Sequence, residues 1–166
     1  ESYGEEEIKA VEECLRDGWI AGFGKRSRQF EEEVSEFFGK KYGVFVNSGS
    51  SACLLALASI DLPKGSEIIT PACTFSTTLA PIIQLGLTPV FVDVNLTSYV
   101  VDVQDVVNVI TDKTKALMIP NLIGNKPDWK SIKEELVKIG RDDIILIEDS
   151  ADTVTHTPET DISTTS

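Results

Sequence analysis

The fold is decided by the stretch Val46-Asn47-Ser48-Gly49-Ser50-Ser51-Ala52, which follows one apolar segment and opens another. Its pattern predicts a short strand over 42–46, a tight polar loop and a buried helix over 51–60. Unpaired backbone N–H groups and the helix dipole both face such a loop, so the stretch outlines an anion site at a helix N-terminus. The loop is also compatible with a plain N-cap and a permissive glycine.

The same alternation of helical and extended patterns continues on both sides of this stretch. Strands are predicted over 67–70, 88–92, 116–119 and 144–147, and helices over 5–16, 28–38, 78–85, 103–109 and 129–138. This alternation predicts an α/β fold with a largely parallel sheet, helices on both faces and ligands at the carboxyl ends of the strands. No helix or strand is predicted over 153–166, and we expect the domain to be cut off there.

Two further segments follow predicted strands: Thr70-Pro71-Ala72-Cys73-Thr74-Phe75, and the apolar run 144–147 that ends in Glu148-Asp149. With the loop at 47–51 they supply an anion cradle, an aromatic platform and a buried carboxylate. A pyridoxal-phosphate-type cofactor needs these parts for its phosphate, its flat ring and its protonated ring nitrogen. Taken alone, Phe75 is equally compatible with a core residue, and Asp149 with a helix cap or a lysine partner.

Composition narrows the class of partner. The 166 residues carry a formal net charge of -12, which argues against nucleic acid and favours a small molecule. The cysteines Cys14, Cys53 and Cys73 are odd in number and widely spaced, so we expect no disulfide framework or metal site, and a reducing cytoplasm. No apolar run approaches a membrane span, and the acidic start is unlike a signal peptide. His156, the single histidine, is expected to be exposed.

From Gly18-Trp19 to Ser166 the chain resembles the DegT/DnrJ/EryC1/StrS family, pyridoxal-phosphate-dependent enzymes of nucleotide-sugar and polysaccharide biosynthesis. No single motif is specific, but the series in this order is. The motifs that carry the resemblance, besides Gly18-Trp19 and Phe30-Glu31, are Val46-Asn47-Ser48-Gly49-Ser50-Ser51-Ala52, Gly65-Ser66-Glu67-Ile68-Ile69-Thr70-Pro71, Pro89-Val90-Phe91-Val92-Asp93-Val94, Thr114-Lys115-Ala116, Leu122-Ile123-Gly124-Asn125 and Ile147-Glu148-Asp149-Ser150-Ala151.

The resemblance implies the large, cofactor-binding domain of fold-type I pyridoxal-phosphate enzymes, a three-layer α/β/α fold, partial over 1–166. The Schiff-base segment and the small carboxyl-terminal domain are expected outside this sequence. By position, the resemblance assigns the cofactor phosphate to Gly49, Ser50, Ser51 and Ser166. It assigns stacking on the ring to Phe75 and pairing with the ring nitrogen to Asp149. The catalytic residue, a Schiff-base lysine or a histidine in its place, is expected a short way beyond Ser166.

The resemblance also places Asp152 among the cofactor-binding residues. Asp152 departs from the aminotransferase pattern, which usually has Gln or His at this position, in contact with the ring hydroxyl. The resemblance therefore leaves two enzymes open. One is an aminotransferase that moves an amino group, with glutamate as donor, to a keto-sugar nucleotide. The other is a 3-dehydratase that holds pyridoxamine phosphate non-covalently and removes the sugar C3 hydroxyl. A regulatory homologue is a third reading. The resemblance also implies a homodimer, and we expect the 166-residue piece to be inactive by itself.

Overall fold

The computed structural model describes residues 3–20, 22–154 and 157–165. Its helices are α1 (Glu5–Asp17), α2 (Lys25–Phe37), α3 (Gly49–Ser59), α4 (Ser76–Gln84), α5 (Val103–Asn108) and α6 (Trp129–Lys138). Its strands are β1 (Glu67–Pro71), β2 (Thr88–Val92), β3 (Thr114–Pro120), β4 (Ile145–Asp149) and β5 (Ile162–Thr164), and a 3₁₀ turn, η1 (Leu122–Gly124), follows β3.

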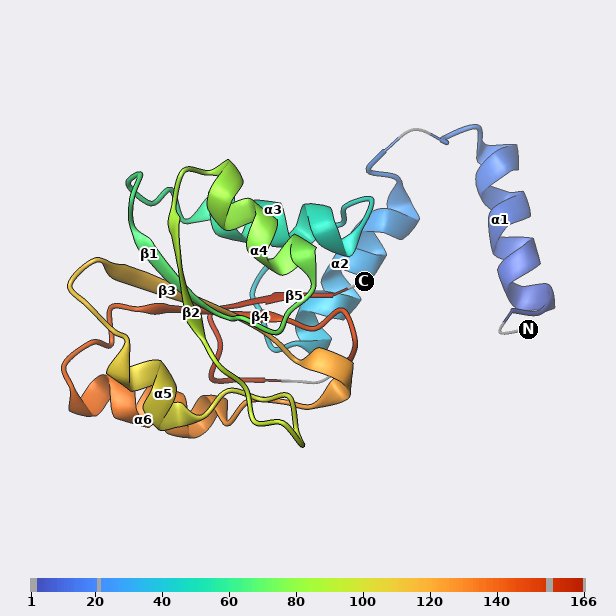
Figure 1. Ribbon diagram of the computed structural model, residues 1–166. Helices are drawn as coiled ribbons and strands as arrows, with labels where there is room; N and C mark the ends of the chain where they lie inside the picture. Colours follow the sequence, from blue (N-terminus) through green and yellow to red (C-terminus); the bar gives the residue numbers. More distant parts are fainter. Residues whose placement is uncertain (1–2, 21, 155–156, 166) are drawn as a thin grey trace.

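The strands form one sheet in the order β2-β1-β3-β4-β5, and all four pairings are parallel. Helices α3 and α4 cover one face of the sheet, and α5 and α6 cover the other (Figure 1). This confirms the predicted three-layer α/β/α fold with a mostly parallel sheet. Because every strand runs the same way, the carboxyl ends of the strands meet at one edge, where a ligand site is expected.

Alternate residues of the central strands feed two separate cores. Ile68, Met118 and Ile147 are buried beneath α3 and α4, whereas Leu117 and Leu146 are buried with Trp129 on the α5 and α6 face. A strand that is covered on both faces is apolar at every position. This is why apolar and polar residues do not alternate over 144–147. The same alternation places Asp149 on the α3 and α4 face and Glu148 on the opposite one.

The predicted strand over 42–46 is wrong, since the structure has no strand there. Tyr42 and Val44 are 77% and 70% exposed, so the segment does not join the sheet. It is held instead against α2: Phe45 N donates to Glu31 Oε1 at 2.8 Å, and a Cβ at Gly43 would lie 2.4 Å from the Glu31 carbonyl oxygen. Contacts with α2 therefore override the strand propensity of Tyr, Val and Phe.

The expectation of an irregular tail is also wrong, because Ile162–Thr164 forms β5 at the edge of the sheet. Ile147 is paired with Ile162 and Asp149 with Thr164. The N–H of Ser150 donates to the Thr164 carbonyl at 2.7 Å. A three-residue strand has too few side chains for a period of two, and it forms here because β4 offers unpaired backbone groups at its edge.

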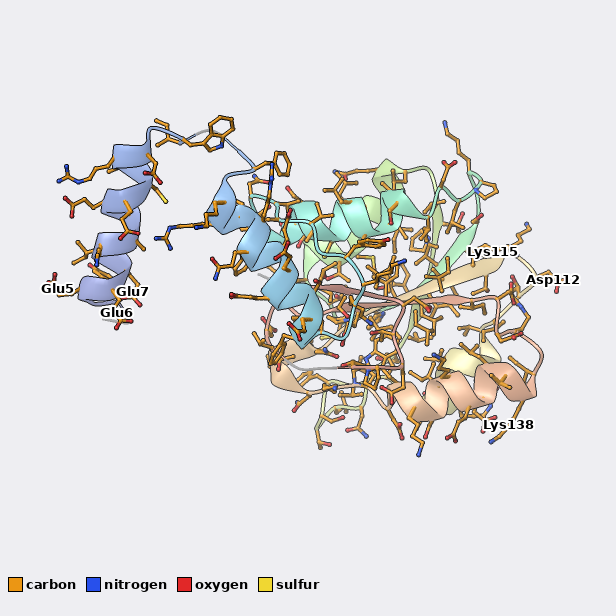
Figure 2. The ribbon with its side chains drawn as sticks, turned by 180° about the vertical axis from the view of Figure 1, so that it is seen from behind. Glu5, Glu6, Glu7, Asp112, Lys115 and Lys138 are labelled. Carbon is orange, nitrogen blue, oxygen red and sulfur yellow. The ribbon has the colours of Figure 1, made fainter. Side chains whose placement is uncertain are left out.

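Helix α1 stands away from the α/β body in both overall views (Figures 1 and 2). It is amphipathic as predicted, but its apolar residues Ile8, Val11 and Leu15 are 50%, 61% and 63% exposed. An Arg26 Nη2 to Glu13 Oε2 ion pair of 2.8 Å connects it to α2. Within the described residues, therefore, α1 buries nothing of its own.

The first turn of α1 carries an acidic cluster, which Figure 2 shows at the end of the helix, away from the body. Glu7 Oε2 accepts a 2.6 Å hydrogen bond from Gly4 N, and this bond lowers the pKa of the Glu7 carboxyl. Negative charge at a helix N-terminus complements the helix dipole. No helix in the described part of the chain combines the length and apolar character that crossing a membrane requires.

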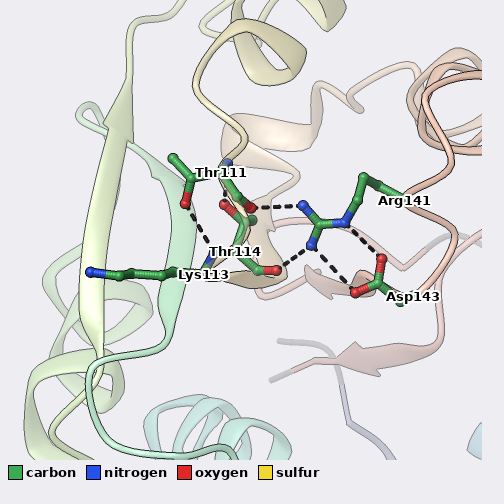
Figure 3. Close-up of polar contacts among 5 residues, drawn as sticks. All are labelled: Thr111, Lys113, Thr114, Arg141 and Asp143. Atoms are coloured by element: carbon green, nitrogen blue, oxygen red, sulfur yellow. Dashed lines mark hydrogen bonds and ion pairs between the residues drawn. The ribbon is translucent and has the colours of Figure 1, made fainter.

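Arg141 joins two loops at the amino ends of β3 and β4 (Figure 3). Its Nη1 donates to the Thr111 carbonyl at 2.7 Å, and its Nη2 donates to the Thr114 carbonyl at 2.6 Å. Its Nε donates to Asp143 Oδ1 at 2.8 Å, and this pair lowers the pKa of Asp143. The guanidinium thus fixes the amino ends of the strands, and the ligand site is expected at their carboxyl ends.

Candidate functional site

A cavity of about 320 Å³ lies where α3 begins and where β3 and β4 end. Its lining residues are Gly49, Ser50, Cys53, Phe75, Thr77, Thr78, Pro120, Asn121, Leu122, Asp149, Ala151 and Asp152. The structure thus brings together five of the residues singled out from the sequence: Gly49, Ser50, Phe75, Asp149 and Asp152. Ser51 does not line the cavity, and Ser166 lies outside the described residues.

The N-terminus of α3 forms one wall of the cavity. Ser48 caps the helix, because its Oγ accepts a 3.2 Å hydrogen bond from Ser51 N. Ser51 Oγ donates to Asn47 Oδ1 at 2.7 Å, so Ser51 stabilises the loop. The N–H groups of Gly49 and Ser50 have no partner within the helix, and both residues border the cavity. This wall therefore suits an anion.

Asp149 ends β4 and forms the buried polar part of the cavity, with 6% of its surface exposed. Its Oδ2 accepts a 2.7 Å hydrogen bond from Thr78 Oγ1. Its Oδ1 lies 3.2 Å from Ala151 N and 3.5 Å from Thr164 Oγ1. The ion pairs found among the described residues do not include Asp149. A buried carboxylate with neutral donors alone is well placed to meet a cationic group in the cavity.

Cys53 lies beside Asp149 with 1% of its surface exposed. Its Sγ is 3.6 Å from Thr164 Oγ1. Burial, and then the charge of Asp149, raise the pKa of the thiol to about 12. The group is therefore a neutral wall residue at physiological pH, because nucleophilic attack requires the thiolate.

Asp152 holds the turn η1 against the cavity. Its Oδ2 accepts a 2.8 Å hydrogen bond from Ile123 N. Ile123 has a left-handed backbone with φ of 51°, which costs free energy for a β-branched residue and needs an external hold. Leu122 of the same turn lines the cavity. The carboxylate thus shapes the wall through a backbone contact that sequence reasoning missed.

Phe75 stands at the start of α4 and is 67% exposed while it lines the cavity. An exposed aromatic ring that lines a cavity offers a flat apolar face to a ligand.

Thr78 and Asn121 are cavity residues that were not assigned to the site from the sequence. Both are fully buried. Asn121 Nδ2 donates to Glu148 Oε2 at 3.0 Å and to Ser150 Oγ at 2.8 Å, whereas its Oδ1 has no partner within the described residues. The available signal was polarity in apolar surroundings: a threonine inside helix α4, and an asparagine directly after the apolar strand β3.

The three-layer α/β/α fold, with the N-terminus of α3 and a buried carboxylate in one cavity, is that of pyridoxal-phosphate-dependent aminotransferases. Solved structures of that fold superpose closely on the chain. GDP-4-keto-6-deoxymannose-3-dehydratase gives a TM-score of 0.83 at 36% identity, covering 92% of this chain and 40% of that protein. The aminotransferase from Psychrobacter cryohalolentis gives 0.82 at 30% identity, covering 92% and 38%.

The chain belongs to the DegT/DnrJ/EryC1/StrS aminotransferase family, whose model matches residues 1–160. Among curated proteins, the GDP-4-keto-6-deoxy-D-mannose 3-dehydratase of Escherichia coli O55:H7 is 38% identical over 154 residues, which are 89% of this chain and 39% of that protein. The GDP-perosamine synthase of Vibrio cholerae is 33% identical over 148 residues, or 89% and 40%. The chain thus spans about two fifths of the length of these relatives. In the described residues, no group of three or more His, Cys, Asp or Glu side chains could hold a metal ion.

Proposed function

We propose that the cavity binds pyridoxal 5'-phosphate or pyridoxamine 5'-phosphate and that the protein acts on a nucleotide-linked keto sugar. One observation carries the proposal: Asp149, buried and bound by neutral donors, shares a cavity with the N-terminus of α3. The N-terminus of α3 suits a phosphate, and the carboxylate of Asp149 suits a protonated ring nitrogen. The related dehydratase has been solved with hydrated pyridoxal phosphate, which supports this choice of ligand.

Each residue has a defined role toward this ligand. Gly49 and Ser50 donate backbone N–H groups to the phosphate, and Ser51 stabilises the loop that presents them. Phe75 covers the ring. Asp149 holds the proton on the ring nitrogen, because a buried carboxylate favours the charged form of its neighbour. The bound cofactor supplies an electron sink, and these contacts keep it in its electron-withdrawing form.

For the reaction we propose transamination of the keto sugar, with glutamate as the amino donor. A structure of the related dehydratase contains a trapped adduct of pyridoxal phosphate with glutamate, which supports glutamate as a ligand of this fold. The GDP-perosamine synthase among the relatives supports the aminotransferase reading.

Removal of the C3 hydroxyl is the second candidate, and Asp152 favours it. Asp152 stands where aminotransferases of the family usually carry Gln or His, and its carboxylate here binds Ile123 N. Relatives named 3-dehydratases include the dTDP-4-dehydro-2,6-dideoxy-D-glucose enzyme of Saccharopolyspora spinosa, 39% identical over 143 residues, which are 81% of this chain and 30% of that protein.

Borohydride trapping separates the two reactions. The protein as encoded, with any sequence beyond these 166 residues, is mixed with pyridoxal phosphate, reduced, digested and mapped by mass spectrometry. Covalent label on a lysine shortly after Ser166 supports transamination. Cofactor that binds with one-to-one stoichiometry but is never trapped supports dehydration. Absence of binding overturns both and favours a regulatory homologue.

We also propose a cytoplasmic homodimer. The three cysteines are free, which fits a reducing compartment. The apolar face of α1 is exposed, and a second copy would cover it. Analytical ultracentrifugation tests this with Leu15→Glu, which should shift the protein toward monomer. Lys9→Gln, on the same helix, lowers the net charge by the same amount and should leave the assembly intact. Equal behaviour of the two variants would exclude this face as the interface.

A further inference from the structure

Glu148, the neighbour of Asp149 on β4, is a fully buried carboxylate on the other face of the sheet. Its Oε2 accepts the 3.0 Å bond from Asn121 Nδ2, and its Oε1 accepts a 2.6 Å bond from Ser163 Oγ. The carboxylate thus ties the end of β3 to β5. The proposed cofactor contacts leave this group unexplained, although a buried charge is costly without compensation.

Lys40 brings a positive charge toward this carboxylate from the segment that follows α2. Its Nζ donates to the Thr160 carbonyl, lies 3.4 Å from the Thr157 carbonyl and lies 3.2 Å from Thr160 Oγ1. Thr160 Oγ1 in turn lies 3.2 Å from Glu148 Oε1. Thr160 therefore bridges the ammonium and the buried carboxylate.

The electrostatics of Lys40 agree with this arrangement. Burial lowers the pKa of the ammonium, and the negative charges of Glu148 and Asp161 act in the opposite direction. The half-buried ammonium binds the carbonyls of the 157–160 turn and holds the turn in place. Exposed lysines lack this property because their side chains remain mobile.

The turn that Lys40 holds leads directly into β5, and β5 contacts the cavity residues. Thr164 Oγ1 lies 3.5 Å from Asp149 Oδ1 and 3.6 Å from Cys53 Sγ. The Asp161 N–H donates to the Leu146 carbonyl at 2.8 Å, which fixes the start of the strand against β4. A displacement of the turn would therefore reach the carboxylate of Asp149.

We propose that Lys40 is a positioning residue for the cofactor site: through Thr160 and Glu148 it fixes β5, and β5 fixes Asp149. This inference rests on the proposed function, because it concerns how well Asp149 is held for a ring nitrogen. Lys40 itself does not line the cavity.

The test compares three variants of the protein as encoded. Lys40→Met removes the charge and keeps the stem, and Lys40→Arg keeps a cation with several donors. Lys133→Met is the matched control. Lys133 Nζ donates to the Glu159 carbonyl of the same turn at 3.1 Å, and among the described residues no hydrogen bond connects this exposed contact to Glu148. Pyridoxamine phosphate affinity is measured by titration, and hydrogen exchange is followed in peptides covering 157–164.

We expect Lys40→Met to weaken pyridoxamine phosphate binding about tenfold, as for groups that orient a ligand-contacting residue, and to accelerate exchange in β5. Lys40→Arg should restore both, and Lys133→Met should change neither. Faster exchange with unchanged affinity would make Lys40 a purely structural group and overturn the proposal, as would no change in either. If the wild type fails to bind, the proposed function fails and the positioning role falls with it. The exchange data then show separately whether Lys40 holds the strand.

Discussion

Thr78 Oγ1 lies 2.7 Å from Asp149 Oδ2, and both side chains are buried, one in the first turn of α4 and the other at the end of β4. The hydroxyl can donate only one hydrogen bond, and this one fixes which carboxylate oxygen turns toward the helix. Asp149 Oδ1 is left beside Ala151 N and Thr164. The orientation of the carboxylate is therefore set by the protein before any ligand arrives.

Replacing Thr78 with valine, which has nearly the same shape, should remove this bond and leave Asp149 Oδ2 buried without its donor. We expect a loss of about 1–3 kcal/mol in the free energy of unfolding, measured by urea denaturation. Thr70→Val is the matched control, because Thr70 is also fully buried and its Oγ1 has no partner within the described residues. Equal stability of the two variants would show that the Thr78 bond contributes nothing.

Asp149→Asn should weaken pyridoxamine phosphate binding without abolishing it. The change removes a charge-assisted hydrogen bond worth about 1.5–3 kcal/mol, which corresponds to about a 10- to 150-fold rise in Kd. Contacts of the phosphate with the N-terminus of α3 remain. Asp93→Asn is a suitable control, since Asp93 is exposed at the end of β2 and does not line the cavity. An unchanged affinity in Asp149→Asn would remove the proposed role.

Two variants of Asp152 separate the effect of its charge from the effect of its hydrogen bond. Asp152→Asn keeps an oxygen that can accept the bond from Ile123 N, whereas Asp152→Ala removes the acceptor. We expect the asparagine variant to bind pyridoxamine phosphate like the parent. The alanine variant should bind more weakly, because the strained turn at Ile123 loses its hold. Equal loss in both variants, measured by titration, would assign the effect to the charge of Asp152.

The buried thiol of Cys53 gives an expectation about pH. With a pKa of about 12, only about one thiol in ten thousand is ionised at pH 8. Cys53 should therefore resist iodoacetamide from pH 7 to 9 in the native protein and react after urea is added, while the exposed Cys73 is labelled throughout. Mass spectrometry of the alkylated peptides gives the answer. Native labelling of Cys53 at the rate of Cys73 would contradict the buried environment.

The same shift has a consequence for stability. The pKa of Cys53 in the folded state lies above the usual value of 9.0, so in the alkaline range the folded protein binds more protons than the unfolded chain. The contribution of the protonated Cys53 thiol to stability is complete below about pH 9 and decreases as the pH rises toward about 12.

The order of predicted helices and strands was enough to predict the three layers of this fold, because the spacing of apolar residues shows which side of each element is buried. It could not predict that the 42–46 segment stays outside the sheet, since that depends on contacts of Phe45 with Glu31 and Phe30 in α2. Nor could it predict β5, whose pairing is decided by the free edge of β4. The site residues found from the sequence stand at the ends of strands and helices. The contact of Thr78 with Asp149, in contrast, depends on how α4 packs against the sheet.

Arg141, whose contacts Figure 3 shows, provides the last test, on stability at the amino ends of the strands. Its guanidinium binds the Thr111 and Thr114 carbonyls and Asp143 together, a geometry that a lysine cannot reproduce. We expect Arg141→Lys to lower the free energy of unfolding by about 1–3 kcal/mol, seen as a lower urea midpoint with an unchanged slope. Arg16→Lys is the matched control, because its pair with Glu12 is exposed on α1 and should contribute below about 0.5 kcal/mol.

Because the loops held by Arg141 lie away from the cavity, cofactor affinity should stay at the wild-type value. A midpoint equal to that of Arg16→Lys would mean that the two loops are held by the strands alone.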